Sequence, residues 1–278
     1  MDLSIIIVNW NTKQLLDNCL ASIYRETQNI FFEIFVVDNA SSDGSAEMVT
    51  QKYPSVRLIQ NQKNIGFAAA NNQAIKQARG KYILVLNSDT IILKNALEKA
   101  VKIMNSRPEV GILGLKTLNK DGSIQKTVRR DPALSTQIFF PSRMKKIFPN
   151  WQPFKEYYFD DFDYEREFYV PQLQGSFLLI RREVFNKIGL LDKKFFIWFE
   201  EVDFCLRARR AGYKILYSPA GSIIHYGGVS FSQIYTLKKQ GLYTRALLYY
   251  FWKNKPKWQW LLLLLFKSPI IIISKIIK

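Results

Sequence analysis

The stretch KYILVLNSDT, residues 81–90, constrains the fold of this chain more than any other part of the sequence. Five consecutive apolar residues, Tyr82 to Leu86, are followed directly by the polar residues Asn87, Ser88 and Asp89. A strand that is apolar at every position is buried on both faces, as in a parallel sheet between two layers of helices. Ligands of such sheets bind beyond the carboxyl ends of the strands, so this polar cluster predicts a binding site. A helix N-cap is the simpler alternative for the same residues.

Strand and helix patterns alternate through the first 115 residues, with short connections between them. Apolar runs predict strands at 3–8, 32–37, 56–59, 82–86 and 110–115, and helical spacing predicts helices at 12–26, 45–53, 66–78 and 93–104. Repeated units of this kind predict an α/β fold with a mostly parallel sheet and right-handed crossovers. Because the chain has neither a GxGxxG turn after its first strand nor a P-loop motif, both of those nucleotide-binding loops are disfavoured.

The pattern becomes looser after residue 116. Residues 117–128 resemble a hairpin with a turn at Asp121 and Gly122. Residues 131–168 are rich in aromatic residues, proline and charge, and their acidic run from Asp160 to Glu167 predicts a solvated surface loop in preference to a metal site, because it lacks the glycine turn of a calcium loop. After this loop the expected elements are two strands and one helix, at 177–180, 222–224 and 182–188.

Polar residues follow three of the predicted strands. Asn9 and Asn11 follow the first, Asp38 follows the second, and the Asn87 to Asp89 cluster follows the fourth. The carboxyl ends of parallel strands meet at one edge of a sheet, so these side chains predict a nucleotide pocket. A pocket without a glycine-rich phosphate loop needs another way to hold a diphosphate, and a divalent cation on Asp89 provides one.

Three carboxylates lie close together in FFIWFEEVDFCLRARR, residues 195–210. Asp203 is spaced to pair with Arg207 one helical turn later, whereas Glu201 has no obvious local partner. A carboxylate among bulky apolar residues tends toward a raised pKa, which suits a general base. The simpler alternative is an amphipathic helix whose acidic first turn, including Glu200, is favoured by the helix dipole.

The single histidine of the chain, His225, lies in SIIHYGG, at the end of a predicted strand and before two glycines. A lone histidine is more often structural than functional. Imidazole is nevertheless a good ligand for a transition metal, and Asp89 would need partners to hold one.

Positive charge is concentrated in the last quarter of the chain. The net charge is +17, and after Asp203 there are 13 Lys or Arg residues and neither Asp nor Glu. Such a region favours a polyanion, which could be nucleic acid or an anionic membrane surface. We do not expect nucleic acid, because phosphates would be repelled by the acidic triplet and by the carboxylates at the strand ends.

The C-terminal residues 237–278 have the composition of an interfacial anchor. The segment 252–260 contains Trp252, Trp258 and Trp260 together with three lysines. Two apolar runs follow, separated by Lys267, and each is too short to span a bilayer. We expect this tail to lie on an anionic membrane surface. The alternative is a helix packed on the domain core or on a second subunit of a homodimer.

Six segments in this order resemble glycosyltransferase family 2, which has the GT-A fold, and especially its bacterial rhamnosyltransferase branch. They are IIIVNWN, VVDNASSDGS, NIGFAAANNQAI, ARGKYILVLNSDT, QGSFLLIRREVFNKIGLLDKKFFIWFEEVDFCLRARRAG and HYGGVS. The resemblance covers roughly Leu3 to Ser230. It implies a Rossmann-like GT-A domain over residues 1–236, with a nucleotide-binding half at 1–115 and an acceptor or catalytic half at 116–236.

The resemblance also implies roles for particular residues. Asp89 matches the metal-binding acid of the family's DxD motif, His225 matches a metal-binding histidine, and Glu201 matches the general base of an acidic pair that begins at Glu200. The residues implied to bind the nucleotide sugar are Val8, Asn9, Asn11, Asp38, Gly66, Asn71, Asn87, Ser88 and Gly175. Two of them depart from the family pattern, since Asn87 replaces the first carboxylate of the motif and Asn71 stands where many relatives carry Arg.

These roles lead us to expect a metal-dependent, inverting glycosyltransferase that uses Mn2+ or Mg2+. The resemblance favours deoxythymidine diphosphate rhamnose as the donor, with a UDP-sugar or other nucleotide sugar as the alternative, and a lipid-linked cell-surface polysaccharide as the acceptor. We expect the protein to be cytoplasmic, at the inner face of the cell membrane. The alternatives of a different class are a basic nucleic-acid-binding protein, which the charge alone suggests, and a non-catalytic scaffold for glycan assembly.

Overall fold

The computed structural model describes residues 1–139, 151–227 and 236–276, and it is built around one large sheet. The strands of this sheet are β1 (Leu3–Asn9), β2 (Phe32–Asp38), β3 (Arg57–Gln60), β4 (Tyr82–Asn87), β5 (Thr90–Ile92), β6 (Val110–Leu118), β8 (Phe168–Tyr169), β10 (Phe177–Arg181) and β11 (Lys214–His225). They lie in the order β3-β2-β1-β4-β10-β6-β11-β5, with β8 paired to β11.

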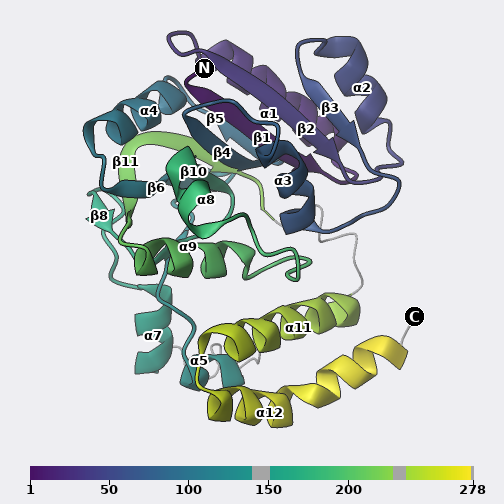
Figure 1. Cartoon of the computed structure of the whole chain (residues 1–278), viewed down its shortest axis with the longest axis vertical. Helices are drawn as coiled ribbons and strands as arrows, with labels where there is room; N and C mark the ends of the chain where they lie inside the picture. Colours follow the sequence, from purple (N-terminus) through teal and green to yellow (C-terminus); the bar gives the residue numbers. More distant parts are fainter. Residues whose placement is uncertain (140–150, 228–235, 277–278) are drawn as a thin grey trace.

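Helices cover both faces of the sheet (Figure 1). One face carries α1 (Lys13–Glu26), α2 (Ser45–Lys52) and α4 (Ala96–Ser106), and the other carries α3 (Phe67–Ile75), α8 (Arg182–Ile188) and α9 (Glu200–Arg210). Alternate residues of β1 face the two layers, since Ile5 and Ile7 belong to one buried cluster and Ile6 to the other. The predicted α/β fold, with a mostly parallel sheet flanked by helices, is confirmed.

Strands β3, β2, β1 and β4 are parallel neighbours, as the alternating pattern predicted. β10 lies antiparallel between β4 and β6, and β11 runs parallel to β6 and antiparallel to β5. The sheet is therefore continuous across residue 115. The division into a nucleotide half and a catalytic half stays a prediction.

The predicted hairpin turn at Asp121 and Gly122 is present, but its arms are short. Leu118 and Ile124 form one antiparallel bridge, and the amide of Gln125 donates to the carbonyl of Thr117 at 2.9 Å. The chain then forms β7 (Val128–Arg129), which pairs with β9 (Gln172–Leu173).

Between β7 and β8, the described residues form α5 (Leu134–Phe139) and α7 (Gln152–Tyr158), and a loop that contains the acidic run 160–167 joins α7 to β8. The loop predicted for this acidic run is therefore present. Phe154 of α7 and Tyr164 of the loop are buried, so this region packs on the domain.

The strand predicted at 222–224 is the end of the much longer β11. A break in its pairing with β6 falls between Ser218 and Ser222, where Pro219 and Gly221 interrupt the strand pattern. Proline cannot donate a ladder hydrogen bond, and such irregularities bend a strand and re-aim its end. The sequence pattern therefore hid the first half of a strand that carries His225 at its last position.

The C-terminal residues form two helices that lie side by side, α11 (Thr236–Asn254) and α12 (Lys257–Ile276) (Figure 1). Leu247, Tyr250 and Phe251 of α11 pack with Phe195 and Phe199, which precede α9. This is the arrangement that the sequence left open as an alternative to a separate tail. No helix among the described residues is long and apolar enough to cross a membrane.

We expect Phe251→Ala to lower the free energy of unfolding by about 3–5 kcal/mol, because a fully buried aromatic ring would leave a cavity. Phe266→Ala on α12 is the matched control, since its ring is 57% exposed, and we expect a change within about 0.5 kcal/mol. Urea unfolding followed by circular dichroism measures both. Two equally small changes would contradict the packing of α11 on the domain.

Candidate active site

A cavity of about 470 Å³ lies at the carboxyl ends of the central parallel strands. Strand pairing aligns Asn9 with Asp38 and Val8 with Asn87, so the predicted polar clusters do meet at one edge of the sheet. The predicted site residues that line the cavity are Val8, Gly66, Asn87, Ser88, Asp89, Gly175, Glu200, Glu201 and His225. Segments from both ends of the chain therefore contribute to one space.

Four of the residues predicted to bind the nucleotide do not line this cavity: Asn9, Asn11, Asp38 and Asn71. The Asn9 amide donates to an Asp38 carboxylate oxygen at 3.0 Å and to the Ser41 hydroxyl at 3.1 Å. Asn71 is fully buried and donates to the carbonyl of Phe67 at 2.9 Å. These side chains lie behind the cavity wall, whereas direct contacts with the nucleotide were predicted for them. Their part in binding stays a prediction.

Asp89 and His225 are brought together by the pairing of β5 with β11. Thr90 is the register partner of His225, and the amide of Tyr226 donates to the carbonyl of Asp89 at 3.0 Å. The Nε2 atom of His225 lies 3.2 Å from Oδ1 of Asp89, and both side chains are largely buried. The two residues thus form a pair at the floor of the cavity.

Gln125 determines which nitrogen of His225 carries the proton. Its amide nitrogen faces two acceptors, the side-chain oxygen of Asn119 at 2.9 Å and the carbonyl of His225 at 3.2 Å. Its amide oxygen lies 2.7 Å from Nδ1 of His225 and must therefore accept a hydrogen bond from Nδ1–H. In the neutral imidazole, Nε2 then carries the lone pair, which faces Asp89 and accepts a hydrogen bond from the amide of Asn87 at 3.2 Å.

The Nε2 lone pair of His225 and the carboxylate of Asp89 are both electron donors, so a cation between them would be favourable. An imidazole nitrogen and a carboxylate oxygen are suitable ligands for a divalent transition metal. Among the described residues there is no group of three or more His, Cys, Asp or Glu that could hold a metal. The pair would therefore supply two ligands, and oxygen atoms of a bound substrate or water would supply the others.

Glu200 and Glu201 begin α9, directly after two residues with unusual backbone angles. Trp198 and Phe199 have φ values of 63° and 68°, in the left-handed region that bulky residues rarely adopt. Each such residue costs roughly 1–2 kcal/mol, so the surrounding packing must hold the turn. The ring of Phe199 lies 5.5 Å from that of Tyr250 on α11. The acidic pair is therefore positioned by a strained turn that the C-terminal helices cover.

The two glutamates differ in burial. Burial raises the pKa of Glu201 to about 7, and burial together with the charge of Glu201 raises the pKa of Glu200 well above its usual value. Neither Oε2 atom has a hydrogen-bond partner among the described residues. Glu201 lines the cavity and has a pKa near neutrality, so it can accept a proton there.

Comparison with known proteins identifies the family of this chain. A protein-family model described as "Glycosyl transferase family 2" matches residues 4–189. The chain belongs to glycosyl transferase family 2.

Two curated relatives of this family 2 glycosyltransferase are informative. An N-acetylglucosaminyl-diphospho-decaprenol L-rhamnosyltransferase of Mycobacterium tuberculosis is 27% identical over 238 residues, which cover 81% of this chain and 76% of the relative. A low-salt glycan biosynthesis hexosyltransferase of Haloferax volcanii is 28% identical over 218 residues, which cover 77% of this chain and 64% of the relative.

Solved glycosyltransferase structures share the fold. A mannosyltransferase from Pyrobaculum calidifontis in complex with GDP-Man and Mn2+ superposes with a TM-score of 0.60 at 17% identity, covering 98% of this chain and 68% of the other. GalNAc-T7 with UDP, GalNAc and Mn2+ gives 0.61 at 17% identity, covering 81% of this chain and 44% of the other. These likenesses confirm the expected GT-A fold.

Several functional candidates of this glycosyltransferase were missed in the sequence. Gln125 had no signal, because its partner His225 is 100 residues away in the chain. Lys239 of α11 also lines the cavity, as the only Lys or Arg among its described lining residues. It supplies a positive charge to the cavity wall. The other unpredicted lining residues are Trp10, Asn39, Asn64, Phe67, Gln174, Ser176, Phe196, Ile197 and Trp198.

Gly66 had been assigned to nucleotide binding, and the structure adds a backbone reason for glycine. Its φ is +88°, and a Cβ atom would come within 2.5 Å of the carbonyl oxygen of Phe196. The next residue, Phe67, donates its amide hydrogen to that same carbonyl at 2.7 Å. Glycine therefore allows the start of α3 to approach the segment that leads to the acidic pair.

Proposed function

We propose that this protein transfers a sugar, rhamnose, from a nucleoside diphosphate donor to a saccharide acceptor with inversion at the anomeric carbon. The observation that supports it best is a single cavity that contains the Asp89–His225 pair and the ionisable Glu201. The relative named as an L-rhamnosyltransferase supports rhamnose as the sugar, and we propose deoxythymidine diphosphate rhamnose, the donor that the sequence resemblance favours. A UDP-sugar is the second candidate, because GalNAc-T7 of the same fold was solved with UDP.

In the proposed reaction, Glu201 accepts the proton of an acceptor hydroxyl as that oxygen attacks the anomeric carbon. The new carbon–oxygen bond forms while the bond to the diphosphate breaks, and the nucleoside diphosphate leaves with the electron pair. One base on the side opposite the leaving group gives a single displacement, and hence inversion. The raised pKa of Glu201 suits this role, because a base is most effective when its pKa lies near the working pH.

Asp89 and His225 would hold a divalent cation, Mn2+ or Mg2+, whose charge offsets the negative charge that develops on the leaving diphosphate. Two features of the chain support this assignment. Gln125 keeps the proton of His225 on Nδ1, so that Nε2 is unprotonated, and the Asp89 carboxylate faces the lone pair of Nε2. We also assign Lys239 to the neutralisation of diphosphate charge in the same cavity.

We further propose that the acceptor is lipid-linked and that the enzyme works on the cytoplasmic face of the membrane. The relative from Mycobacterium tuberculosis is named for a diphospho-decaprenol acceptor. The outer face of α12 is apolar, with a stripe of exposed residues at helical spacing: Trp258, Leu261, Leu262, Leu265 and Phe266. Lys267, which interrupts the apolar sequence, is only 5% exposed and so leaves this stripe unbroken.

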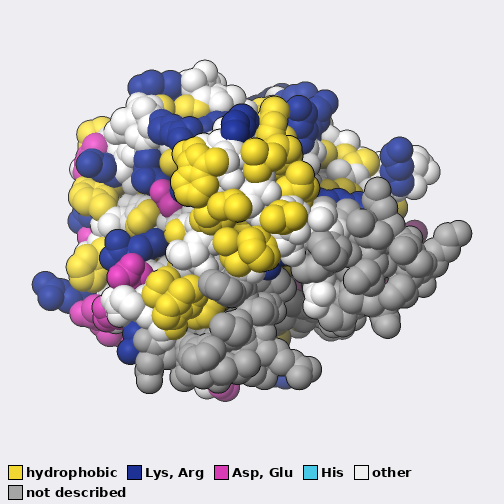
Figure 2. Space-filling view, turned by 90° about the horizontal axis from the view of Figure 1, so that it is seen from below, with side chains coloured by type: hydrophobic (Ala, Val, Ile, Leu, Met, Phe, Trp, Pro, Cys, Tyr) yellow, Lys and Arg dark blue, Asp and Glu magenta, His cyan; other side chains and the backbone are white. Residues whose placement is uncertain are grey.

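The charge around the α12 stripe favours an anionic lipid surface over a second subunit as its occupant. Figure 2 shows hydrophobic side chains gathered on this side of the molecule with Lys and Arg side chains around them. No acidic residue follows Asp203 in the chain. An exposed apolar helix face with basic residues beside it is typical of helices that lie in the headgroup layer.

For the catalytic base, we expect Glu201→Gln to bind the donor with near-wild-type affinity and to lower kcat by roughly 10²–10⁴-fold. In the wild type, kcat should rise with pH and level off above about pH 7, because only the ionised carboxylate accepts a proton. Glu183→Gln, at an exposed acid on α8, is the control and should match the wild type. Unchanged turnover in Glu201→Gln would reject this residue as the base.

For the metal pair, we expect Gln125→Met to weaken Mn2+ binding by roughly 10–100-fold, because the variant loses the acceptor that keeps the proton on Nδ1 of His225. Asp89→Ala should abolish Mn2+-dependent binding of a nucleoside diphosphate. Calorimetric titration measures both, with the exposed Gln14→Met as a control. Full nucleotide affinity in the presence of a chelator would count against the metal assignment.

For the membrane surface, we expect the wild type to float with phosphatidylglycerol vesicles and a Leu265→Glu, Phe266→Glu variant to lose at least roughly tenfold in partitioning. Each substitution removes apolar area worth about 1.5–3 kcal/mol when buried in lipid. Phe31→Glu, at a ring 79% exposed on another part of the molecule, is the control. A wild type that stays out of the vesicle fraction, or a dimer that the variant dissolves, would contradict lipid as the occupant.

A further inference from the structure

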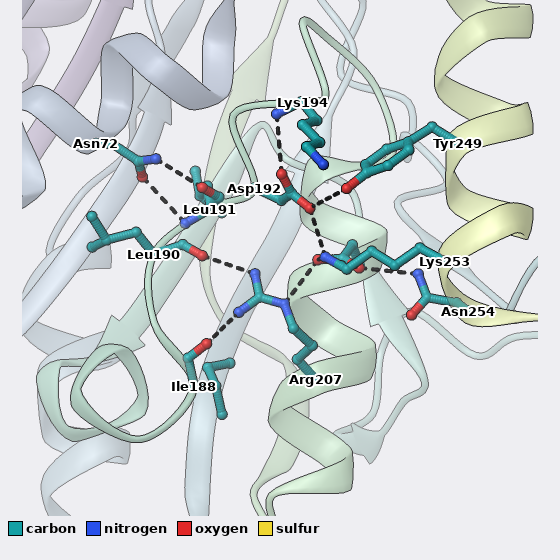
Figure 3. A network of polar contacts seen from close by, with 11 residues as sticks. Asn72, Ile188, Leu190, Leu191, Asp192, Lys194, Arg207, Tyr249, Lys253 and Asn254 are labelled. Carbon is teal, nitrogen blue, oxygen red and sulfur yellow. Dashed lines mark hydrogen bonds and ion pairs between the residues drawn. The ribbon is translucent and has the colours of Figure 1, made fainter.

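Lys253 of α11 bridges two carboxylates that lie on either side of the acidic pair in the sequence (Figure 3). Its ammonium group is 2.7 Å from Oδ2 of Asp192 and 3.0 Å from the carboxylate of Asp203. Asp192 lies in the loop before α9, and Asp203 lies in the first turn of α9. One side chain from the C-terminal helices therefore closes the segment 192–203 into a loop.

The segment that Lys253 closes forms one wall of the cavity. Phe196, Ile197, Trp198, Glu200 and Glu201 all line the cavity, and all lie between the two bridged carboxylates. The same segment contains the strained turn before α9. A change in the separation of its ends would therefore move the general base relative to the floor of the cavity.

The Asp203 end of the bridge is deeply buried. Its carboxylate is 0% exposed and accepts hydrogen bonds from Arg207 at 2.8 Å and from Asn254 at 3.0 Å, besides that from Lys253. Arg207 in turn donates to the carbonyls of Ile188 and Leu190 at 2.6 and 2.9 Å. Removing a cationic partner of a buried carboxylate strongly lowers the stability of a folded protein. The contacts with Arg207 and Lys253 therefore hold Asp203 in place.

The Asp192 end is held by the same helix. Oδ2 of Asp192 also accepts a hydrogen bond from the hydroxyl of Tyr249 at 2.9 Å, and Oδ1 accepts one from the amide of Lys194 at 3.0 Å. Between the two ends, the fully buried ring of Phe195 packs 4.8 Å from the ring of Tyr249. Helix α11 thus contacts the segment by polar bonds at its ends and by aromatic packing between them.

We propose that Lys253 is a positioning residue for the transfer reaction. By bridging Asp192 and Asp203, it holds Glu201 at a fixed position relative to the Asp89–His225 pair on the cavity floor. The proposal rests on the proposed role of Glu201 as the base. Lys253 is not among the residues that line the cavity. Its effect is exerted through the geometry of residues 192–203, so the C-terminal helices form part of the working domain.

The test compares Lys253→Met with Lys253→Arg and with Arg245→Met, which removes an exposed positive charge from the same helix. We expect Lys253→Met to lower kcat by roughly 100-fold, because small misplacements of a reacting group have effects of that size, while the donor KM changes less than about threefold. Lys253→Arg should recover most of the rate, and Arg245→Met should match the wild type.

Hydrogen exchange gives a second measurement that does not depend on turnover. We expect faster amide exchange in peptides from 196–203 of Lys253→Met, with unchanged exchange in peptides that cover β4 and β5. Asp192→Asn, which keeps the Asp203 end intact, should show the same change to a smaller degree. This milder variant provides the comparison if Lys253→Met does not fold.

Two results would overturn the proposal. Faster exchange in 196–203 with an unchanged kcat would make the bridge structural only, and unchanged exchange in both variants would show that it does not hold the segment. The failure of the proposed function would look different, because a wild type that transfers no sugar from any donor would contradict the role of Glu201 and still leave the exchange comparison to decide the bridge.

Discussion

The short antiparallel pairing of β5 with β11 is the contact on which the site depends. It places the last residue of β11 beside the last residue of β4, although His225 and Asn87 are 138 positions apart in the chain. β5 follows β4 after only two residues, so the buried central strand fixes its position. β11 is in turn fixed along β6. The Asp89–His225 pair is therefore as rigid as the sheet itself, which is what a site with few protein ligands requires.

Within one cavity, two carboxylates are held in opposite electrostatic environments. Asp89 lies beside an imidazole nitrogen, near the end of a strand, where binding of a cation would be favourable. Glu201 has no hydrogen-bond partner for its Oε2 atom among the described residues, and burial raises its pKa to about 7. A site that must both hold a positive charge and take up a proton needs this separation of roles, because two carboxylates in the same environment would compete for the same charge.

The parts of this structure that follow from local patterns were predictable. Continuous apolar runs identified β1, β2 and β4, and their polar ends identified the cavity edge, since period and burial are encoded in neighbouring residues. The meeting of His225 with Asp89 came from a family resemblance, because nothing local to SIIHYGG specifies its partner strand. The antiparallel insertion of β10 and the role of Gln125 also depend on contacts distant in sequence.

Other features carried sequence signals that pointed elsewhere. Bulky aromatic residues disfavour a left-handed backbone, so Trp198 and Phe199 gave no indication of the turn that they form. The mixture of aromatic and charged residues in 152–164 gave no helical or strand pattern, yet residues 152–158 form α7, and the rings of Phe154 and Tyr164 are buried. The composition of the C-terminal helices suits both a membrane surface and a domain core. The structure shows both kinds of face: Tyr250 and Phe251 of α11 are buried against the domain, whereas Trp258 and Leu265 of α12 are exposed.

Lys253 follows the whole sheet and the acidic pair in the sequence, so the parts of the cavity are synthesised in a fixed order. The strands β1 to β4 are synthesised first, and domains begin to fold during synthesis from the N-terminal side. The bridge between Asp192 and Asp203 can form only after α11 has left the ribosome. A nascent chain with a complete sheet would therefore still lack the contact that closes the segment 192–203.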